Sequence, residues 1–195
     1  TFIEILTDAT DNDESWIGTG GGAGAHWTIS DTAGDDKKMW FECRFKVQNI
    51  ADSQKNIFIG LCEEARASAD TITDAGVLGD FDFLGFNQPE ADGDGLDFTY
   101  PKATQAIQVK IADLATLVAG TAVKAGFVYN PDRVAAERIA VFLNNQEQAT
   151  YVTGTNIAAA TFPDAEELAL LAGLKNGAAA AHKFQIDWWR IVQLF

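Results

Sequence analysis

The chain ends in FQIDWWRIVQLF (residues 184–195), where large apolar side chains recur at nearly every second position. A period of two is typical of a β-strand. This segment is either a strand within the core or an exposed tail that needs a partner. On a strand, one face carries Phe184, Ile186, Trp188, Arg190 and Val192, and the other carries Gln185, Asp187, Trp189, Ile191 and Gln193. Because both faces hold large apolar groups, we expect a core strand whose second face lies partly under loops or a neighbouring subunit.

The same alternation continues through the rest of the chain. Further strands are expected at residues 39–47, 56–64, 83–88, 96–100, 105–112, 123–131, 138–152 and 168–177. We expect segment 56–64 to be the antiparallel neighbour of segment 39–47, and Asn144 and Asn145 to form a tight hairpin turn because Asn tolerates left-handed backbone angles. Residues 68–79 are expected to form a short helix or coil. About ten short strands without a long helix predict an antiparallel β-sandwich.

Length and composition indicate one compact domain. The chain has 195 residues, of which 47% are hydrophobic, so it can bury a large core. We expect residues 1–25 to be an acidic, glycine-rich N-terminal arm and residues 26–195 to be the sandwich domain. Cys43 and Cys62 fall in expected strands and are interpreted as buried, reduced side chains.

The charge excludes some classes of partner. The chain carries 28 acidic and 14 basic residues, a net charge of −14. Phosphate-rich surfaces attract clustered Lys and Arg, so we expect neither nucleic acid nor an anionic membrane as a partner. No run of 18 apolar residues is present, and the sequence opens without a basic and apolar leader. We therefore expect folding in a reducing cytoplasm.

Several segments resemble the concanavalin A-like and laminin-G-like jelly-roll domains. They are MWFECRFKV (39–47), VKAGFVYNP (123–131), RIAVFLNNQEQATYV (138–152) and FQIDWWRIVQ (184–193). The resemblance implies an all-β, concanavalin A-like jelly-roll β-sandwich of two antiparallel sheets. In this chain Asn144-Asn145 replaces the Asp-Gly that is usual at the central turn of the family.

Other segments resemble virion proteins of tailed bacteriophages. They are NIFIGLCEEA (56–65), FLGFNQPEADGDGLDFTYPK (83–102) and TNIAAATFPDAEELALLAGLKNGAA (155–179). The resemblance implies a non-enzymatic structural protein that decorates or stabilises the capsid. Its expected partners are virion proteins such as the major capsid protein and further copies of this chain. The expected location is the virion, assembled in the host cytoplasm.

Catalysis is not expected. Glycoside hydrolases of the laminarinase type share this sandwich and carry two Glu and one Asp on one strand, but here that spacing falls on Gln185, Asp187 and Arg190. A retaining hydrolase needs two carboxylates about 5–5.5 Å apart, and this strand supplies only one. The only imidazoles are His26 and His182, and the chain has no Gly-x-Ser-x-Gly motif to place a nucleophilic serine.

One acidic loop is a candidate calcium site. Asp92, Asp94 and Asp97 alternate with glycines in EADGDGLDF (90–98), and hard oxygen ligands on a sharply turning backbone suit Ca²⁺. The EF-hand spacing fails, because Ala103 stands where the loop needs its final Glu. The alternative is a solvated hairpin turn, for which Asp-Gly is the expected chemistry. No other cofactor is expected.

Glycan binding is the alternative function. Lectin-like sandwiches stack sugars on exposed aromatic rings, and the candidate contacts for a glycan or a protein partner are Trp16, Trp27 and Trp40. Trp40 is the best exposed candidate, because it points away from Phe41, Cys43 and Phe45 on its strand. In this interpretation the chain is a lectin-like module for attachment to host glycans.

Overall fold

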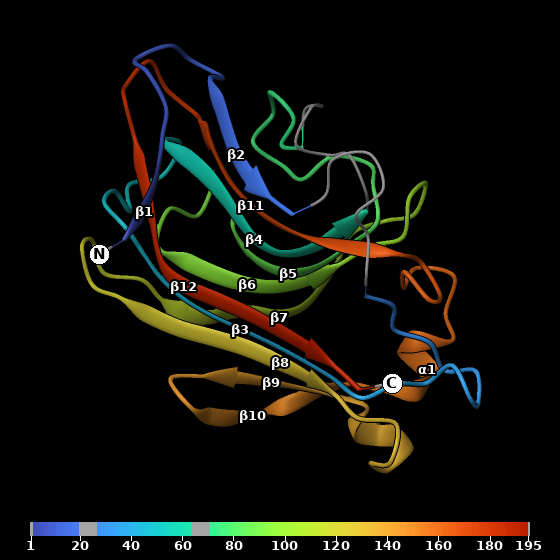
Figure 1. Ribbon diagram of the computed structural model, residues 1–195. Helices are drawn as coiled ribbons and strands as arrows, with labels where there is room; N and C mark the ends of the chain where they lie inside the picture. Colours follow the sequence, from blue (N-terminus) through green and yellow to red (C-terminus); the bar gives the residue numbers. More distant parts are fainter. Residues whose placement is uncertain (1, 20–26, 64–70, 195) are drawn as a thin grey trace.

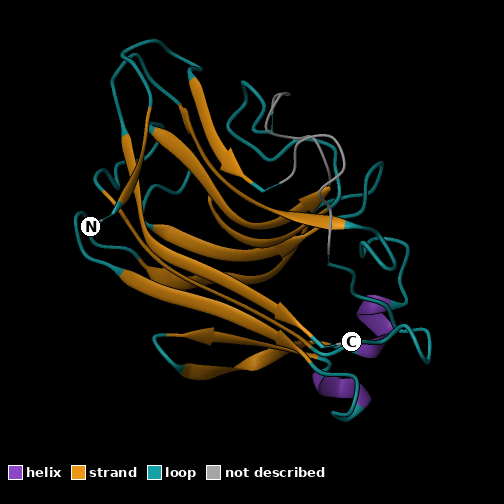
Figure 2. Ribbon diagram, viewed as in Figure 1, coloured by secondary structure: helices purple, strands orange, loops and turns teal. Residues whose placement is uncertain are grey.

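The structure is a computed structural model that describes residues 2–19, 27–63 and 71–194. Two antiparallel sheets of six strands each pack face to face (Figures 1 and 2). Sheet I has the order β1-β12-β3-β8-β9-β10, and sheet II has the order β2-β11-β4-β5-β6-β7. The all-β, two-sheet sandwich expected from the sequence is confirmed.

The elements of sheet I are β1 (Ile3–Leu6), β3 (Met39–Val47), β8 (Val123–Tyr129), β9 (Ile139–Leu143), β10 (Gln146–Val152) and β12 (Lys183–Gln193). The elements of sheet II are β2 (Glu14–Gly18), β4 (Lys55–Glu63), β5 (Phe83–Gln88), β6 (Gly95–Tyr100), β7 (Gln108–Thr116) and β11 (Leu168–Asn176). A 3-10 turn, η2 (Ala135–Glu137), and a single helical turn, α1 (Gly154–Ile157), lie in the connections. None of the helices in these described parts is long and apolar enough to cross a bilayer.

The pairing of β3 with β4 that we expected is wrong. β3 pairs with β12 and β8 in sheet I, whereas β4 pairs with β11 and β5 in sheet II. The polar segment between them carries the chain from one sheet to the other. Alternating hydrophobicity identifies a strand and its buried face, but it contains no information about the partner strand.

The first strands lie at the edges of the two sheets. Residues 3–6 of the expected arm pair with β12, and residues 14–18 pair with β11. The expected boundary between residues 25 and 26 lies outside the described residues. His26 also lies outside them.

Aromatic rings fill the space between the sheets. Phe41 of β3 and Phe127 of β8 stack with ring centroids 5.2 Å apart, and Phe98 of β6 reaches Phe127 at 5.7 Å. Phe45 meets Phe184 of β12 edge-on at 5.5 Å. All five side chains are buried. The core therefore joins β3, β8 and β12 of sheet I to the inner face of sheet II.

A second apolar cluster lies on the outer face of sheet II. Its members come from β4, β5, β11 and the segment before β5: Phe58, Cys62, Ile72, Leu78, Phe81, Phe83 and Leu171, with Trp16 packed against them. Of the helix and the coil that we expected here, residues 71–79 form the coil, which is closed by an antiparallel bridge between Ile72 and Leu78. This cover explains why β4, β5 and β11 are buried along both faces.

The closing strand is a core strand, but its alternation breaks in the middle. Phe184 and Ile186 face the core as expected. A β-bulge between Ile186 and Trp188 then reverses the faces, so that Trp189 packs against the core instead of Trp188. The expectation of one uninterrupted alternation is therefore wrong from Asp187 onward, because one extra residue in a bulge exchanges the two faces.

The hairpin turn between β9 and β10 is confirmed. Asn144 and Asn145 have φ angles of 48° and 69°, in the left-handed region that a two-residue turn of this kind requires. Cys43 and Cys62 are both buried and unbonded to each other, as expected.

Candidate binding groove on sheet I

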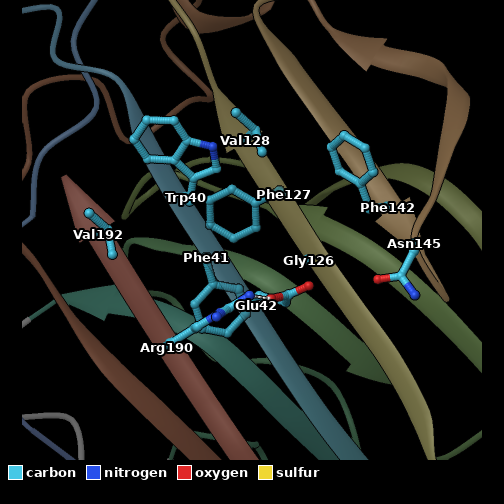
Figure 3. Close-up of a pocket in the computed structure, with 10 residues that line it drawn as sticks. All are labelled: Trp40, Phe41, Glu42, Gly126, Phe127, Val128, Phe142, Asn145, Arg190 and Val192. Atoms are coloured by element: carbon cyan, nitrogen blue, oxygen red, sulfur yellow. Dashed lines mark hydrogen bonds and ion pairs between the residues drawn. The ribbon is translucent and has the colours of Figure 1, made fainter. Parts of the chain in front are cut away.

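The outer face of sheet I contains a groove of about 500 Å³ (Figure 3). Its walls come from β3, β8, β12 and the β9–β10 hairpin. The lining residues are Trp40, Phe41, Glu42, Gly126, Phe127, Val128, Phe142, Asn145, Arg190 and Val192. The groove therefore combines aromatic and aliphatic walls with a small polar group.

A glycine in the middle of β8 opens the groove. Gly126 lies between Glu42 of β3 and Phe142 of β9 in the sheet register. A Cβ at this position would lie 2.7 Å from the carbonyl oxygen of Phe41, so no larger residue fits without a shift of the backbone. A glycine inside a strand often marks such a close approach. Because Gly126 has no side chain, the outer face of β8 is open between Glu42 and Phe142.

One wall is an apolar row that crosses three strands. Trp40 pairs with Val192 of β12 on one side and with Val128 of β8 on the other. The Trp40 side chain is 36% exposed and Val192 is 52% exposed. Solvent-exposed aromatic and aliphatic groups side by side are available for stacking with a ligand.

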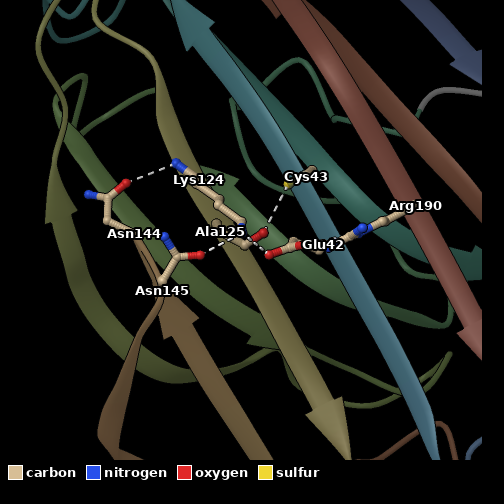
Figure 4. Close-up of polar contacts among 7 residues, drawn as sticks. All are labelled: Glu42, Cys43, Lys124, Ala125, Asn144, Asn145 and Arg190. Atoms are coloured by element: carbon tan, nitrogen blue, oxygen red, sulfur yellow. Dashed lines mark hydrogen bonds and ion pairs between the residues drawn. The ribbon is translucent and has the colours of Figure 1, made fainter.

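The next row is polar and held rigidly by ion pairs (Figure 4). The Glu42 carboxylate accepts a hydrogen bond of 2.8 Å from the Arg190 Nε and forms an ion pair with the Lys124 ammonium. The Lys124 Nζ also donates to the Asn145 Oδ1, and its backbone N–H donates to the Asn144 Oδ1 at 3.1 Å. This network fixes Glu42, Arg190 and Asn145 at the edge of the groove.

The network also fixes the charge of Glu42. Burial raises the pKa of this carboxyl, but the hydrogen bonds from Lys124 and Arg190 outweigh burial and hold the pKa below its ordinary value. Glu42 is the only carboxylate among the described residues that line the groove. An ionised, doubly paired carboxylate accepts hydrogen bonds well and is a weak general base.

The three tryptophans predicted as contacts lie at three different places. Trp40 lines the groove. Trp16 packs against the second cluster, with its ring over Gly173 of β11. Trp27 is half-buried against the main core, next to Leu168. The structure therefore provides no common platform for the three rings, and the groove uses only Trp40.

The aspartates of loop 90–98 accept hydrogen bonds from backbone N–H groups of the loop and of neighbouring segments. The Asp92 Oδ1 accepts a hydrogen bond from the Gly95 N–H at 3.2 Å, and the Asp97 Oδ1 accepts one from the Asp113 N–H at 2.9 Å. The Asp94 carbonyl accepts from the Leu117 N–H at 2.7 Å. Over residues 2–19, 27–63 and 71–194, no three His, Cys, Asp or Glu side chains are grouped to hold a metal ion. Calcium binding by Asp92, Asp94 and Asp97 stays a prediction.

Sequence reasoning identified Trp40 and missed the polar side of the groove. Glu42 and Arg190 are opposite each other only because of the bulge in β12. Lys124, 82 residues after Glu42 in the sequence, reaches the Glu42 carboxylate from β8. The one available signal was Gly126, since a glycine within an otherwise regular strand indicates a hollow or a close contact.

The arrangement of the two sheets is that of an all-β, concanavalin A-like jelly-roll β-sandwich. No family model and no curated protein sequence matches it. Among solved structures, it is similar to the carbohydrate recognition domain of Emp47p, with a TM-score of 0.64 and 11% identity over 98% of this chain and 83% of that one.

Two further structures have the same fold. The endo-β-1,4-glucuronan lyase from the fungus Trichoderma reesei has a TM-score of 0.61 at 11% identity, over 97% of this chain and 80% of the lyase chain. Peanut lectin in complex with a nine-residue peptide has a TM-score of 0.56 at 14% identity, over all of this chain and 87% of the lectin chain. At these identities the likeness establishes the fold alone. It gives no support to a phage origin, which stays a prediction.

Proposed function

We propose that this protein binds carbohydrate in the groove of sheet I and does not catalyse a reaction there. The observation that carries the proposal is the exposed Trp40 indole next to a fixed set of hydrogen-bonding groups, Glu42, Arg190 and Asn145. The apolar face of a sugar ring stacks on an indole, while its hydroxyls need both donors and acceptors at the edge of that ring. The groove offers a stacking surface, hydrogen-bond donors and hydrogen-bond acceptors.

The neighbouring structures support this class of ligand. The Emp47p domain is described as a carbohydrate recognition domain, and peanut lectin is a lectin by name. The groove lacks the residues for a lyase or hydrolase reaction, because its lining has no imidazole, thiol or phenol and only one carboxylate. Glu42 is already paired with two cations, so it is poorly suited to take a proton from a substrate.

A second candidate function is protein binding in a virion, which the resemblance of the sequence to virion proteins implies. The apolar row of the groove continues toward the C-terminus, where Val192 and Leu194 are each more than half exposed. Such a surface also suits a protein partner, such as a capsid protein or another copy of this chain. Attachment of a virion to a host glycan would combine both functions.

A glycan array separates these candidates. Wild-type protein and the variants Trp40→Ala, Trp40→Phe and Val109→Ala are applied to printed β-glucans and to mannose- and galactose-terminated oligosaccharides. We expect Trp40→Ala to weaken binding about ten-fold, equivalent to about 1.4 kcal/mol, because it removes the stacking surface. Trp40→Phe should retain part of the binding. Val109 is exposed on β7 of sheet II and does not line the groove, so Val109→Ala is the matched control.

Absence of binding to every glycan, or equal binding by Trp40→Ala and wild type, would contradict the proposal. Co-sedimentation of the chain with capsid particles that is lost in Trp40→Ala would then favour the protein-binding candidate.

A further inference from the structure

A second pocket, of about 600 Å³, lies at the other end of β3 from the groove. It is formed where β3 ends, where β12 begins and where the chain enters β4. Trp40 and Lys46 are both on the outer face of β3, and six residues of strand place them about 20 Å apart. The residues of the pocket used below are Lys46, Gln48, Gln54, His182, Lys183 and Gln185.

The pocket is basic, although the protein is strongly acidic. Its ionisable lining residues are Lys46, His182 and Lys183. Lys183 is paired with Glu4 of β1 at 3.2 Å. Lys46 lies over the Phe2 ring at 4.3 Å and has no ion-pair partner among the residues that the structure describes. Lys46 is therefore an unpaired cation at the mouth of the pocket, in a chain with a net charge of −14.

His182 provides a second, independent indication of a ligand. Its side chain is only 7% exposed, and its Nε2 is buried without a hydrogen-bond partner within the described part of the chain. The backbone of His182 is held in place by Thr7, whose Oγ1 accepts from the His182 N–H at 3.1 Å and whose own N–H donates to the His182 carbonyl at 3.2 Å. A buried polar atom without a partner is rare in native structures and calls for an explanation, and a bound ligand or ion is one.

A buried lysine adds positive charge behind His182. Lys55 of β4 is fully buried, and its Nζ donates to the Gln88 Oε1 at 2.9 Å. Burial lowers the pKa of Lys55 to about 7, and burial together with the Lys55 charge lowers the pKa of His182. An anion in the pocket would raise the pKa of both groups, so its binding takes up protons and becomes tighter as the pH falls.

The amide side chains in the pocket suit hydroxyl groups. The Gln48 Nε2 donates to the Gln185 Oε1, which leaves the Gln48 carbonyl oxygen as an acceptor. The Gln54 side chain also lines the pocket. Amides supply donors and acceptors together, as recognition of neighbouring hydroxyls requires.

We propose that this pocket binds a small sugar acid, with its carboxylate at Lys46 and His182 and its hydroxyls at Gln48 and Gln54. The pocket is separate from the Trp40 groove. The proposal stands whether or not the groove binds carbohydrate.

Isothermal titration calorimetry at pH 6 and pH 8 tests this proposal with three probes. D-Glucuronate carries both a carboxylate and hydroxyls, D-glucose lacks the carboxylate, and propionate lacks the hydroxyls. At pH 6 we expect D-glucuronate to bind at least ten-fold more tightly than either of the other two. The affinity for D-glucuronate should fall several-fold at pH 8, because Lys55, with a pKa of about 7, is then largely neutral.

The variants identify the site. Lys46→Gln and His182→Asn should each weaken D-glucuronate binding at least five-fold, whereas Trp40→Ala and the matched surface change Lys38→Gln should not alter it. Lys46 is on the surface, so Lys46→Gln tests the site even where His182→Asn disturbs the fold. The proposal is overturned if D-glucuronate does not bind at pH 6, if D-glucose or propionate binds equally well, if Lys46→Gln binds as wild type does, or if Trp40→Ala abolishes binding.

Discussion

Replacement of Lys55 with methionine should stabilise the protein, by an amount that depends on pH. Lys55 is fully buried, with a neutral amide, Gln88, as its hydrogen-bond acceptor. Burial lowers its pKa from 10.5 to about 7. A difference of one pKa unit corresponds to about 1.4 kcal/mol, so the buried charge destabilises the native state by about 5 kcal/mol below pH 7. Lys55→Met removes this charge and keeps most of the apolar volume.

The sign of the pH dependence follows from the same shift. Between pH 7 and pH 10.5 the unfolded chain keeps the proton on Lys55 and the native protein loses it, so the stability of the wild type rises with pH. Below pH 7 both states hold the proton, and the full penalty is present. The difference in unfolding free energy between Lys55→Met and wild type should therefore be largest at pH 6. Above pH 7 it should shrink by about 1.4 kcal/mol per pH unit.

Urea denaturation followed by tryptophan fluorescence at pH 6, 7, 8 and 9 measures this difference. Comparison of the two proteins at each pH cancels the titration of shared groups other than His182, whose pKa the Lys55 charge lowers. Two results would show that Lys55 carries no buried charge that destabilises the native state: wild-type and variant stabilities that run parallel across the whole pH range, or a variant that is less stable than wild type at pH 6. Loss of the hydrogen bond to Gln88 lowers the stabilisation by Lys55→Met by about 1 kcal/mol at every pH. It leaves the dependence of that stabilisation on pH unchanged.

Two further substitutions test the packing and the turn. Gly173→Ala should destabilise the protein by about 1–3 kcal/mol, because the new Cβ would overlap the Trp16 ring; an unchanged urea midpoint would show that Trp16 does not cover Gly173. Asn144→Val should destabilise it by about 1–2 kcal/mol in thermal unfolding, because φ is 48° at this position. Asn144→Gly, the matched control, should lose less, and equal losses in both variants would argue against backbone strain as the cause.

Strands were predictable from the sequence because their two faces have different neighbours. In β3, Phe41, Cys43 and Phe45 alternate with charged residues, and the structure buries the first set and leaves the second at the outer face. The assignment of β3 and β4 to different sheets was not predictable. Both strands carry apolar inner faces toward the same core, so hydrophobicity alone cannot tell a hairpin from a connection that crosses between sheets.

The groove could be predicted only in part for a related reason. The exposure of Trp40 followed from its position in one strand, which is local information. The partners of Glu42 come from β8 and β12, and the alignment of Arg190 with Glu42 depends on the bulge at Asp187. A bulge shifts register by one residue without a distinct sequence pattern, so the site it creates becomes visible only in three dimensions.

Nuclear magnetic resonance of ¹⁵N-labelled protein shows directly whether a carbohydrate binds at Trp40. The indole N–H signal of Trp40, assigned with Trp40→Phe, is followed during titration with the oligosaccharide that binds best on the array. We expect this signal to shift progressively to saturation, while those of Trp16 and Trp27 stay in place. An unchanged Trp40 signal at saturating sugar would contradict carbohydrate binding in the groove of sheet I.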